Sequence, residues 1–321
     1  MRTQKPNVVL ICTDQWRGDC LSIAGHPTVH TPTLDALAME GVRFSNAYTA
    51  CPSCIASRAS LFTGLAPCSH GRVGYQDSIP WDYETTLAGE FTRNGYQTQA
   101  IGKMHVYPPR SQTGFQNVIL HDGFLTQMRR EVEDPGRIDD YIVWLRRETG
   151  RLSADYFDHG INCNSWLVRE WDKEEYLHPT NWVVSEGIDF LRRRDPRKPF
   201  FLFLSFVRPH PPFDPPRTYL EQYLASAIPD PPRGDWIKRF SSQANPWKYD
   251  ALAGFDDHDK VSRARAGYYA LITHIDHQIN RFLETLEMNG ISPQNTIIMF
   301  LSDHGELLGD HGLFRKYLPY E

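Results

Sequence analysis

Hydrophobic positions along this chain gather in short continuous runs, which are separated by longer segments with helical spacing. Three runs are apolar at nearly every position and rich in β-branched or aromatic residues: 7–13 (NVVLICT), 199–206 (PFFLFLSF) and 296–302 (TIIMFLS). Residues 97–101 (QTQAI) form a further candidate strand. Continuous apolar runs of this length are typical of strands buried on both faces of a parallel sheet.

Segments with helical periodicity lie between these runs. The longest covers 261–288, where apolar side chains recur at positions i, i+3, i+4 and i+7 before Asn289 and Gly290 end the pattern. Amphipathic spacing, or cap and stop residues, predict shorter helices at 32–40, 54–63, 85–93 and 180–194. The alternation of strands and helices predicts an α/β fold with a doubly wound, mainly parallel sheet flanked by helices.

Two long stretches, about 120–178 and about 214–259, follow neither period clearly. We interpret them as irregular insertions over the active face, where substrate selectivity often resides. No internal repeat and no low-complexity linker interrupts the chain, so we expect a single domain over 1–321.

The composition narrows the range of partners. The 321 residues are 40% hydrophobic and 23% charged, as in an ordinary globular protein with a large core, and the net charge is −5. This balance gives no sign of a nucleic-acid partner, and no apolar run approaches the length of a membrane helix. Six cysteines are too sparse for a disulfide scaffold. Residues 1–5 carry no leader pattern, so a cytoplasmic location is expected, with a removed leader as the alternative.

Polar side chains follow each candidate strand. In an open parallel sheet the carboxyl ends of the strands lie at one edge, which is where ligands bind. Each of these side chains alone is more often a turn, cap or packing residue, but their common position predicts one site. Its members at the strand ends are Asp14, Gln15, Lys103, His105, His210, Asp303 and His304.

Cys54 lies in the segment 51–64 (CPSCIASRASLFTG), where a turn of small residues runs into a short helix. The start of a helix favours negative charge, so this position can hold an oxyanion and promotes thiol reactivity. Arg58, one turn later, is expected on the same face and could pair with either. The alternatives are a small packed cysteine, or a redox pair or half of a zinc site formed with Cys51.

The predicted donor set favours a hard cation. Carboxylate and carbonyl oxygens with at most one imidazole suit Ca²⁺, Mg²⁺ or Mn²⁺ better than a thiolate-bound zinc ion. Lysines, an arginine and histidines around such a cation suit a tetrahedral oxyanion whose charge rises in the transition state.

Cys54-Ile-Ala56-Ser-Arg58, followed by Thr63-Gly64, resembles the signature Cys-x-Pro/Ala-x-Arg of the sulfatase family in the alkaline phosphatase superfamily. Ala56 stands where most members carry proline. The order of further motifs matches the same family: Asp14-Gln15, Gly102-Lys103-x-His105, Pro209-His210-x-Pro-Phe, Ser302-Asp303-His304-Gly-Glu306 and Leu313-Phe-x-Lys316.

This resemblance implies hydrolysis of sulfate esters by a formylglycine made from Cys54, with one divalent metal. Ca²⁺ is the expected ion, and Mg²⁺ or Mn²⁺ are alternatives. The residues implied as metal ligands are Asp14, Gln15, Asp303 and His304. Those implied in catalysis are Cys54, Arg58, Lys103, His105, His210 and Lys316.

The implied partners are a small-molecule or carbohydrate sulfate ester and the enzyme that generates formylglycine. Gln15 and His304 are similar to residues of bacterial phosphonate monoesterases and phosphodiesterases, so hydrolysis of those esters is an alternative. Members of the family usually carry a further C-terminal subdomain, so the resemblance implies that this subdomain is missing after Glu321. An inactive truncated fragment is therefore a third interpretation. The particular ester and the oligomeric state stay open.

Overall fold

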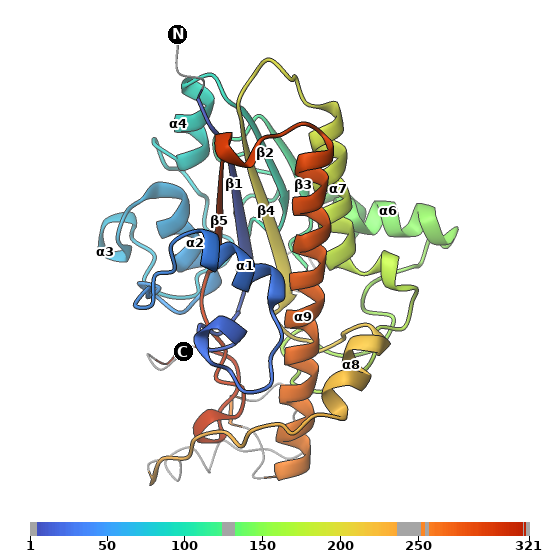
Figure 1. Ribbon diagram of the computed structural model, residues 1–321. Coiled ribbons are helices and arrows are strands. Elements are labelled where there is room, and N and C mark those ends of the chain that lie inside the picture. The colour runs from blue at the N-terminus through green and yellow to red at the C-terminus, as the bar shows by residue number, and fades with distance from the viewer. Residues whose placement is uncertain (1–4, 124–131, 236–251, 254–256, 317, 319–321) are drawn as a thin grey trace.

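The computed structural model describes residues 5–123, 132–235, 252–253, 257–316 and 318 (Figure 1). Its centre is a sheet of five parallel strands in the order β3-β2-β4-β1-β5. The strands are β1 (Asn7–Asp14), β2 (Gln97–Gly102), β3 (Asn117–Leu120), β4 (Phe200–Pro209) and β5 (Thr296–Ser302). The predicted parallel α/β fold is thus confirmed.

Helices cover both faces of this sheet (Figure 1). Side chains of β1 alternate between two separate cores: Val9 and Ile11 enter one, while Val8 and Leu10 enter the other. The larger core includes α1 (Pro32–Glu40), α7 (Pro179–Arg193) and α9 (His258–Met288), and the smaller one includes α2 (Cys54–Thr63) and α4 (Leu87–Arg93). Two covered faces explain why β1 and β4 read as continuous apolar runs.

The outermost strand on one side, β5, departs from the expected burial. Ile297 and Met299 are 48% and 41% exposed, and they alternate with less exposed residues. The expectation of burial on both faces is therefore wrong for β5. Among the described residues it pairs only with β1, so this strand lies at the edge of the sheet.

The long helix α9 has the predicted end, followed by Asn289, and begins at His258. The side chain of Asp257 caps it by accepting a hydrogen bond from the backbone N–H of Lys260. Its buried side chains lie along the stripe expected from the sequence. In the part of the chain that the structure describes, neither this helix nor any other is long and apolar enough to span a bilayer.

The two stretches without clear periodicity contain helices that the sequence analysis did not predict. In the first, α6 (Asp140–Thr149) buries Tyr141, Ile142 and Leu145, and in the second, α8 (Arg217–Leu224) buries Leu220 and Tyr223. Residues 124–131, 236–251 and 254–256 of these stretches lie outside the described residues. The remaining short helices are η1 (Ser22–Ala24), α3 (Pro67–His70), η2 (Pro135–Arg137), η3 (Glu175–Leu177), η5 (Pro293–Asn295) and η6 (Asp310–Gly312).

Gly102 ends β2 immediately before a predicted site residue. Its φ of 93° lies in the left-handed region, and a Cβ atom there would come 1.9 Å from the backbone oxygen of Ser205. The next residue, Lys103, donates its backbone N–H to the same oxygen over 2.9 Å. Close contact with β4 at a glycine therefore sets where Lys103 leaves the sheet.

The substitution Gly102→Ala is expected to reduce the free energy of unfolding by about 2–4 kcal/mol, because it adds a backbone clash to an unfavourable φ. Gly64→Ala is the matched control, since Gly64 has a φ of 70° with open space around the added Cβ. It should cost about 1 kcal/mol. Urea unfolding of both variants measures the difference, and equal losses would show that the close contact with Ser205 is unimportant.

Candidate functional site

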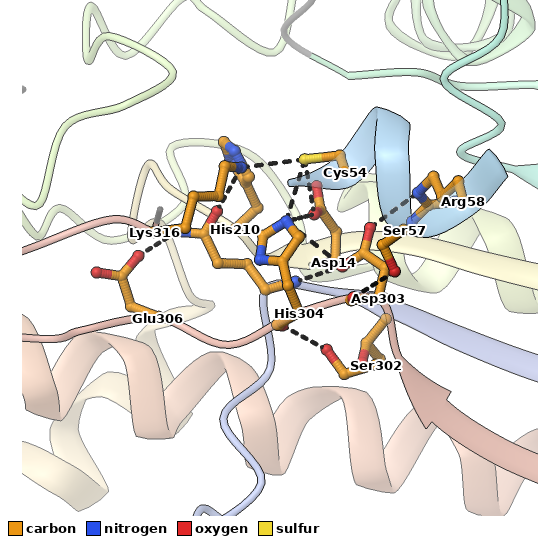
Figure 2. Close-up of polar contacts among 12 residues, drawn as sticks. Asp14, Cys54, Ser57, Arg58, His210, Ser302, Asp303, His304, Glu306 and Lys316 are labelled. Carbon is orange, nitrogen blue, oxygen red and sulfur yellow. Dashed lines mark hydrogen bonds and ion pairs between the residues drawn. The ribbon is translucent and has the colours of Figure 1, made fainter. Parts of the chain in front are cut away.

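The side chain of Cys54 lies at the carboxyl edge of the sheet, where α2 begins (Figure 2). Its Sγ atom is 3.0 Å from Nζ of Lys316, 3.2 Å from Nε2 of His304 and 3.4 Å from Oδ1 of Asp14. All four side chains are buried. The structure therefore brings Asp14 of β1, together with His304 and Lys316 from the stretch after β5, around the sulfur atom of Cys54.

Positive charge dominates the surroundings of this thiol. Burial and the charge of Asp14 raise the pKa of Cys54, but Lys103, Lys316 and His304 act in the opposite direction. The balance lowers its pKa from 9.0 to about 6. The position thus stabilises negative charge, as the sequence predicted for the start of this helix.

Two carboxylates form the floor of the site. Asp14, Cys54, Asp303 and His304 each offer one ligand atom, and these atoms lie within 4.8 Å of one another. Burial and the negative charge of Asp14 raise the pKa of Asp303. Burial also opposes ionisation of Asp14, but Lys103, which forms an ion pair with it, contributes to a pKa well below 3.8. A divalent cation between two buried carboxylates would offset this repulsion, so the donor set fits a hard metal ion.

Gln15 reaches the same edge through an unusual backbone conformation, with a φ of 70°. Its backbone N–H donates to Oδ1 of Asp303 over 3.1 Å, and its carbonyl accepts from the hydroxyl of Tyr268 over 2.6 Å. The side-chain oxygen accepts from Nζ of Lys316 over 2.9 Å, while the side-chain nitrogen donates to Glu306. The amide oxygen therefore faces into the site beside the carboxylates.

Arg58 binds Asp303 rather than Cys54. Its Nε lies 2.8 Å from Oδ2 of Asp303, and its Nη1 donates to the backbone oxygen of Lys103 and to Oγ of Ser205. The guanidinium is fully buried. Among the described residues no hydrogen bond or ion pair joins it to the Cys54 thiol. Its position under the site indicates that it holds Asp303 in place.

The two predicted histidines occupy different surroundings. The backbone N–H of His210 donates to the carbonyl of Asp14 over 3.1 Å, and its ring Nδ1 lies 2.8 Å from the oxygen of Pro211. His105 is buried with a φ of 57°, and its backbone N–H donates to Asp122. Neither ring nitrogen of His105 has a hydrogen-bond partner among the described residues. The structure thus leaves both nitrogens of that ring available.

Glu306 is the main contributor that sequence reasoning left without a role. It is fully buried, and its carboxylate accepts from Gln15 and from the backbone N–H groups of Leu308 and Arg315. These bonds fix the segment that leads to Lys316. The sequence shows an acidic residue three positions after Asp303. It does not show the partners of that residue, because Gln15 is distant in sequence and the other two partners are backbone N–H groups.

Arg58→Met is expected to reduce the free energy of unfolding of the metal-free chain by about 3–5 kcal/mol, because the buried Asp303 carboxylate would lose its ion pair with the guanidinium. Arg93→Met is the control, since Arg93 makes an exposed ion pair with Glu90. It should have no measurable effect. Urea denaturation of the two variants makes the comparison, and a loss in both or in neither would contradict this assignment.

Known proteins resemble the chain over nearly its whole length. An arylsulfatase of Clostridium perfringens (strain 13 / Type A) is 52% identical over 321 residues, which cover 99% of this chain and 66% of the relative. A choline-sulfatase of Rhizobium meliloti (strain 1021) is 29% identical, over 100% of this chain and 61% of the relative. The chain thus spans less than two thirds of the length of these relatives.

The fold also has solved counterparts. The crystal structure of the phosphonate monoester hydrolase of Agrobacterium radiobacter matches with a TM-score of 0.78 and 27% identity, over 97% of this chain and 64% of that one. The Sulfatase family model matches residues 6–320. The resemblance stated from the motifs is therefore confirmed, and the chain belongs to the sulfatase family.

Proposed function

We propose that this chain hydrolyses sulfate esters to an alcohol and inorganic sulfate. The observation that carries the proposal is the position of Cys54. It begins a helix, and its sulfur lies within 3.4 Å of a lysine, a histidine and an aspartate. The 52% identity to an arylsulfatase supports this reaction over others of the superfamily.

The proposed nucleophile is a formylglycine made from Cys54 by a separate maturation enzyme. Hydration of its aldehyde gives two hydroxyl groups on one carbon. The oxygen of one attacks sulfur, and the bond from sulfur to the ester oxygen breaks as the alcohol leaves. Loss of the proton from the second hydroxyl then breaks the first carbon–oxygen bond, which releases sulfate and restores the aldehyde.

The residues that would hold a divalent cation are Asp14, Gln15, Asp303 and His304. Ca²⁺ is the expected ion, with Mg²⁺ or Mn²⁺ as alternatives. When bound, the cation supplies positive charge that favours ionisation of a nearby hydroxyl and offsets the charge of the sulfate group. Arg58 keeps Asp303 in position for this role through their buried ion pair.

The two buried lysines are the proposed partners of the sulfate oxygens. Lys316 lies 3.0 Å from the Cys54 sulfur, and Lys103 forms an ion pair with Asp14 at the same centre. Both are 3% exposed, so their charges act with little screening by water. They would offset the negative charge that develops as the nucleophile adds to sulfur.

The histidines are the proposed groups for proton transfer. Burial and Lys103 lower the pKa of His105 to about 3, so its ring is neutral and can accept the proton of the second hydroxyl. Burial and Lys316 also hold the pKa of His210 well below 6.5. A bound sulfate ester brings negative charge that opposes this effect, and His210 would then protonate the leaving alcohol.

A second candidate is the hydrolysis of phosphonate monoesters or phosphodiesters by the same nucleophile. The match to a phosphonate monoester hydrolase, together with Gln15 and His304, favours it. Comparing kcat/KM for the 4-nitrophenyl esters of sulfate, phenylphosphonate and phosphate diester separates the two. The proposed substrate is the sulfate ester of a small molecule or a carbohydrate, and a panel of aryl, choline and sugar sulfates would define the class.

The tryptic peptide containing Cys54, from active protein made with a maturation enzyme, should be about 18 Da lighter than the cysteine form. This mass change reflects replacement of the thiol by an aldehyde. Mass spectrometry of the peptide tests it directly. An unmodified cysteine in protein that turns over sulfate esters would rule out the mechanism, and in inactive protein it would favour the inactive-fragment interpretation.

Cys54→Ser should release at most one equivalent of alcohol per chain, because a serine ester has no second hydroxyl with which to expel sulfate. Quench-flow measurement of alcohol release, with intact mass to detect the trapped ester, tests this expectation. Cys68→Ser is the control, since Cys68 is exposed and free, and it should turn over like the parent. Continued turnover by Cys54→Ser would disprove the role of the diol.

A further inference from the structure

The segment that carries His210 is closed by a buried ion pair. Arg208 is the last residue but one of β4, and Asp214 follows six residues later. Nε of Arg208 lies 2.7 Å from Oδ1 of Asp214, and Nη2 lies 2.6 Å from Oδ2. The two side chains are 1% and 0% exposed. Two parallel bonds fix the relative orientation of the two ends as well as their distance.

His210 lies between these two ends, and other contacts hold the segment beside the site. The backbone N–H of His210 donates to the carbonyl of Asp14. At the far end, Phe213 forms a parallel bridge with Val168 and accepts from the backbone N–H of Arg169. The short segment is therefore tied to β1 at its middle and to the first insertion at its end.

The surroundings of Asp214 keep it ionised for this contact. Burial opposes its charge, but Arg208 and two histidines lower its pKa below the ordinary range. Nε2 of His159 lies 3.3 Å from Oδ2, and Nε2 of His178 lies 4.0 Å from Oδ1. Both carboxylate oxygens of Asp214 accept from Arg208, so the two side chains form a two-bond ion pair.

Stability alone is a weak reason for such a pair. Removing two charges from water costs several kcal/mol per ion, and apolar residues of similar volume often serve as well. A buried arginine and carboxylate joined by two parallel hydrogen bonds can adopt only one relative orientation. We propose that the Arg208–Asp214 ion pair is a positioning element that fixes the His210 side chain at the reaction centre. This inference rests on the proposed role of His210.

The experiment is a double-mutant cycle in matured, metal-loaded protein. Asp214→Asn and Arg208→Lys are each made in the parent and in the His210→Ala background, and kcat and KM are measured for an alkyl sulfate and for 4-nitrophenyl sulfate. In the parent, each variant should lower kcat for the alkyl sulfate by about 10²-fold with little change in KM, because a catalytic group is misplaced. The good leaving group of the nitrophenyl ester should reduce the loss.

In the His210→Ala background the same substitutions should change kcat by less than about twofold, since the group that they position is absent. Asp276→Asn is the matched control. Asp276 is also a fully buried aspartate, but it accepts from the backbone N–H groups of Thr33 and Leu34 at the start of α1. It should alter the unfolding midpoint without a loss that depends on the leaving group.

The positioning role would be overturned if the losses in kcat were additive in the double variants, or if they were equal for the two esters. This conclusion requires that His210→Ala alone lowers kcat more for the alkyl sulfate than for 4-nitrophenyl sulfate. If His210→Ala does not discriminate, the proposed role of His210 fails and the inference fails with it. Arg208→Lys keeps a positive partner for Asp214, so it carries the test if Asp214→Asn does not fold.

Discussion

Two carboxylates buried next to each other impose the main physical constraint on this fold. Removing Asp14 and Asp303 from water is costly, and the negative charge of Asp14 raises the pKa of Asp303 further. Lys103 pairs with Asp14 and Arg58 pairs with Asp303, and both cations are themselves buried. The charges are thus compensated as a set, to which His304 also belongs, since its Nε2 lies 3.4 Å from Oδ1 of Asp14 and 3.6 Å from Oδ1 of Asp303.

The backbone near this edge is unusual because several chain segments must converge on one point. The parallel register between β1 and β4 shifts after Thr13, so that Asp14 lies opposite Pro209. That shift lets the carbonyl of Asp14 accept from His210. Gln15, directly beyond β1, and His105, three residues beyond β2, adopt a positive φ. Such conformations cost energy and are kept where surrounding contacts determine them, as the bonds from Gln15 to Asp303 and Tyr268 do here.

The sequence was sufficient for the parts of the fold that are continuous and long. The strands β1 and β4 and the helix α9 were predicted with nearly the right bounds, because burial on two faces or along one stripe leaves a regular pattern. The four-residue strand β3 and the short helices α6 and α8 were not predicted. β3 has four residues and α8 eight, which leaves little length for a period to appear. α6 is as long as the predicted α2, but it lies in a charged stretch that we interpreted as irregular. Packing against the rest of the chain determines such elements.

The motifs in the sequence predicted which residues gather at the strand ends, but they did not predict which residues contact one another there. Arg58 was expected to pair with Cys54 or an oxyanion because helical spacing puts it on the same face, yet the structure directs it to Asp303. Glu306 was visible in a motif, but its bonds to Gln15 and Arg315 depend on the folded path of the chain. Contacts between residues far apart in sequence leave no local pattern.

Two buried arginines and Lys316 differ in the groups that they contact. Arg58 and Arg208 both bind aspartates that support the site from within the fold, and a permanently charged, planar guanidinium suits a fixed carboxylate. Lys316, by contrast, lies against the Cys54 sulfur. A lysine carries a compact charge on a flexible stem, so it can follow a group whose geometry changes during a reaction. An arginine in place of Lys316 would bring a larger, more rigid group against Cys54 and Gln15.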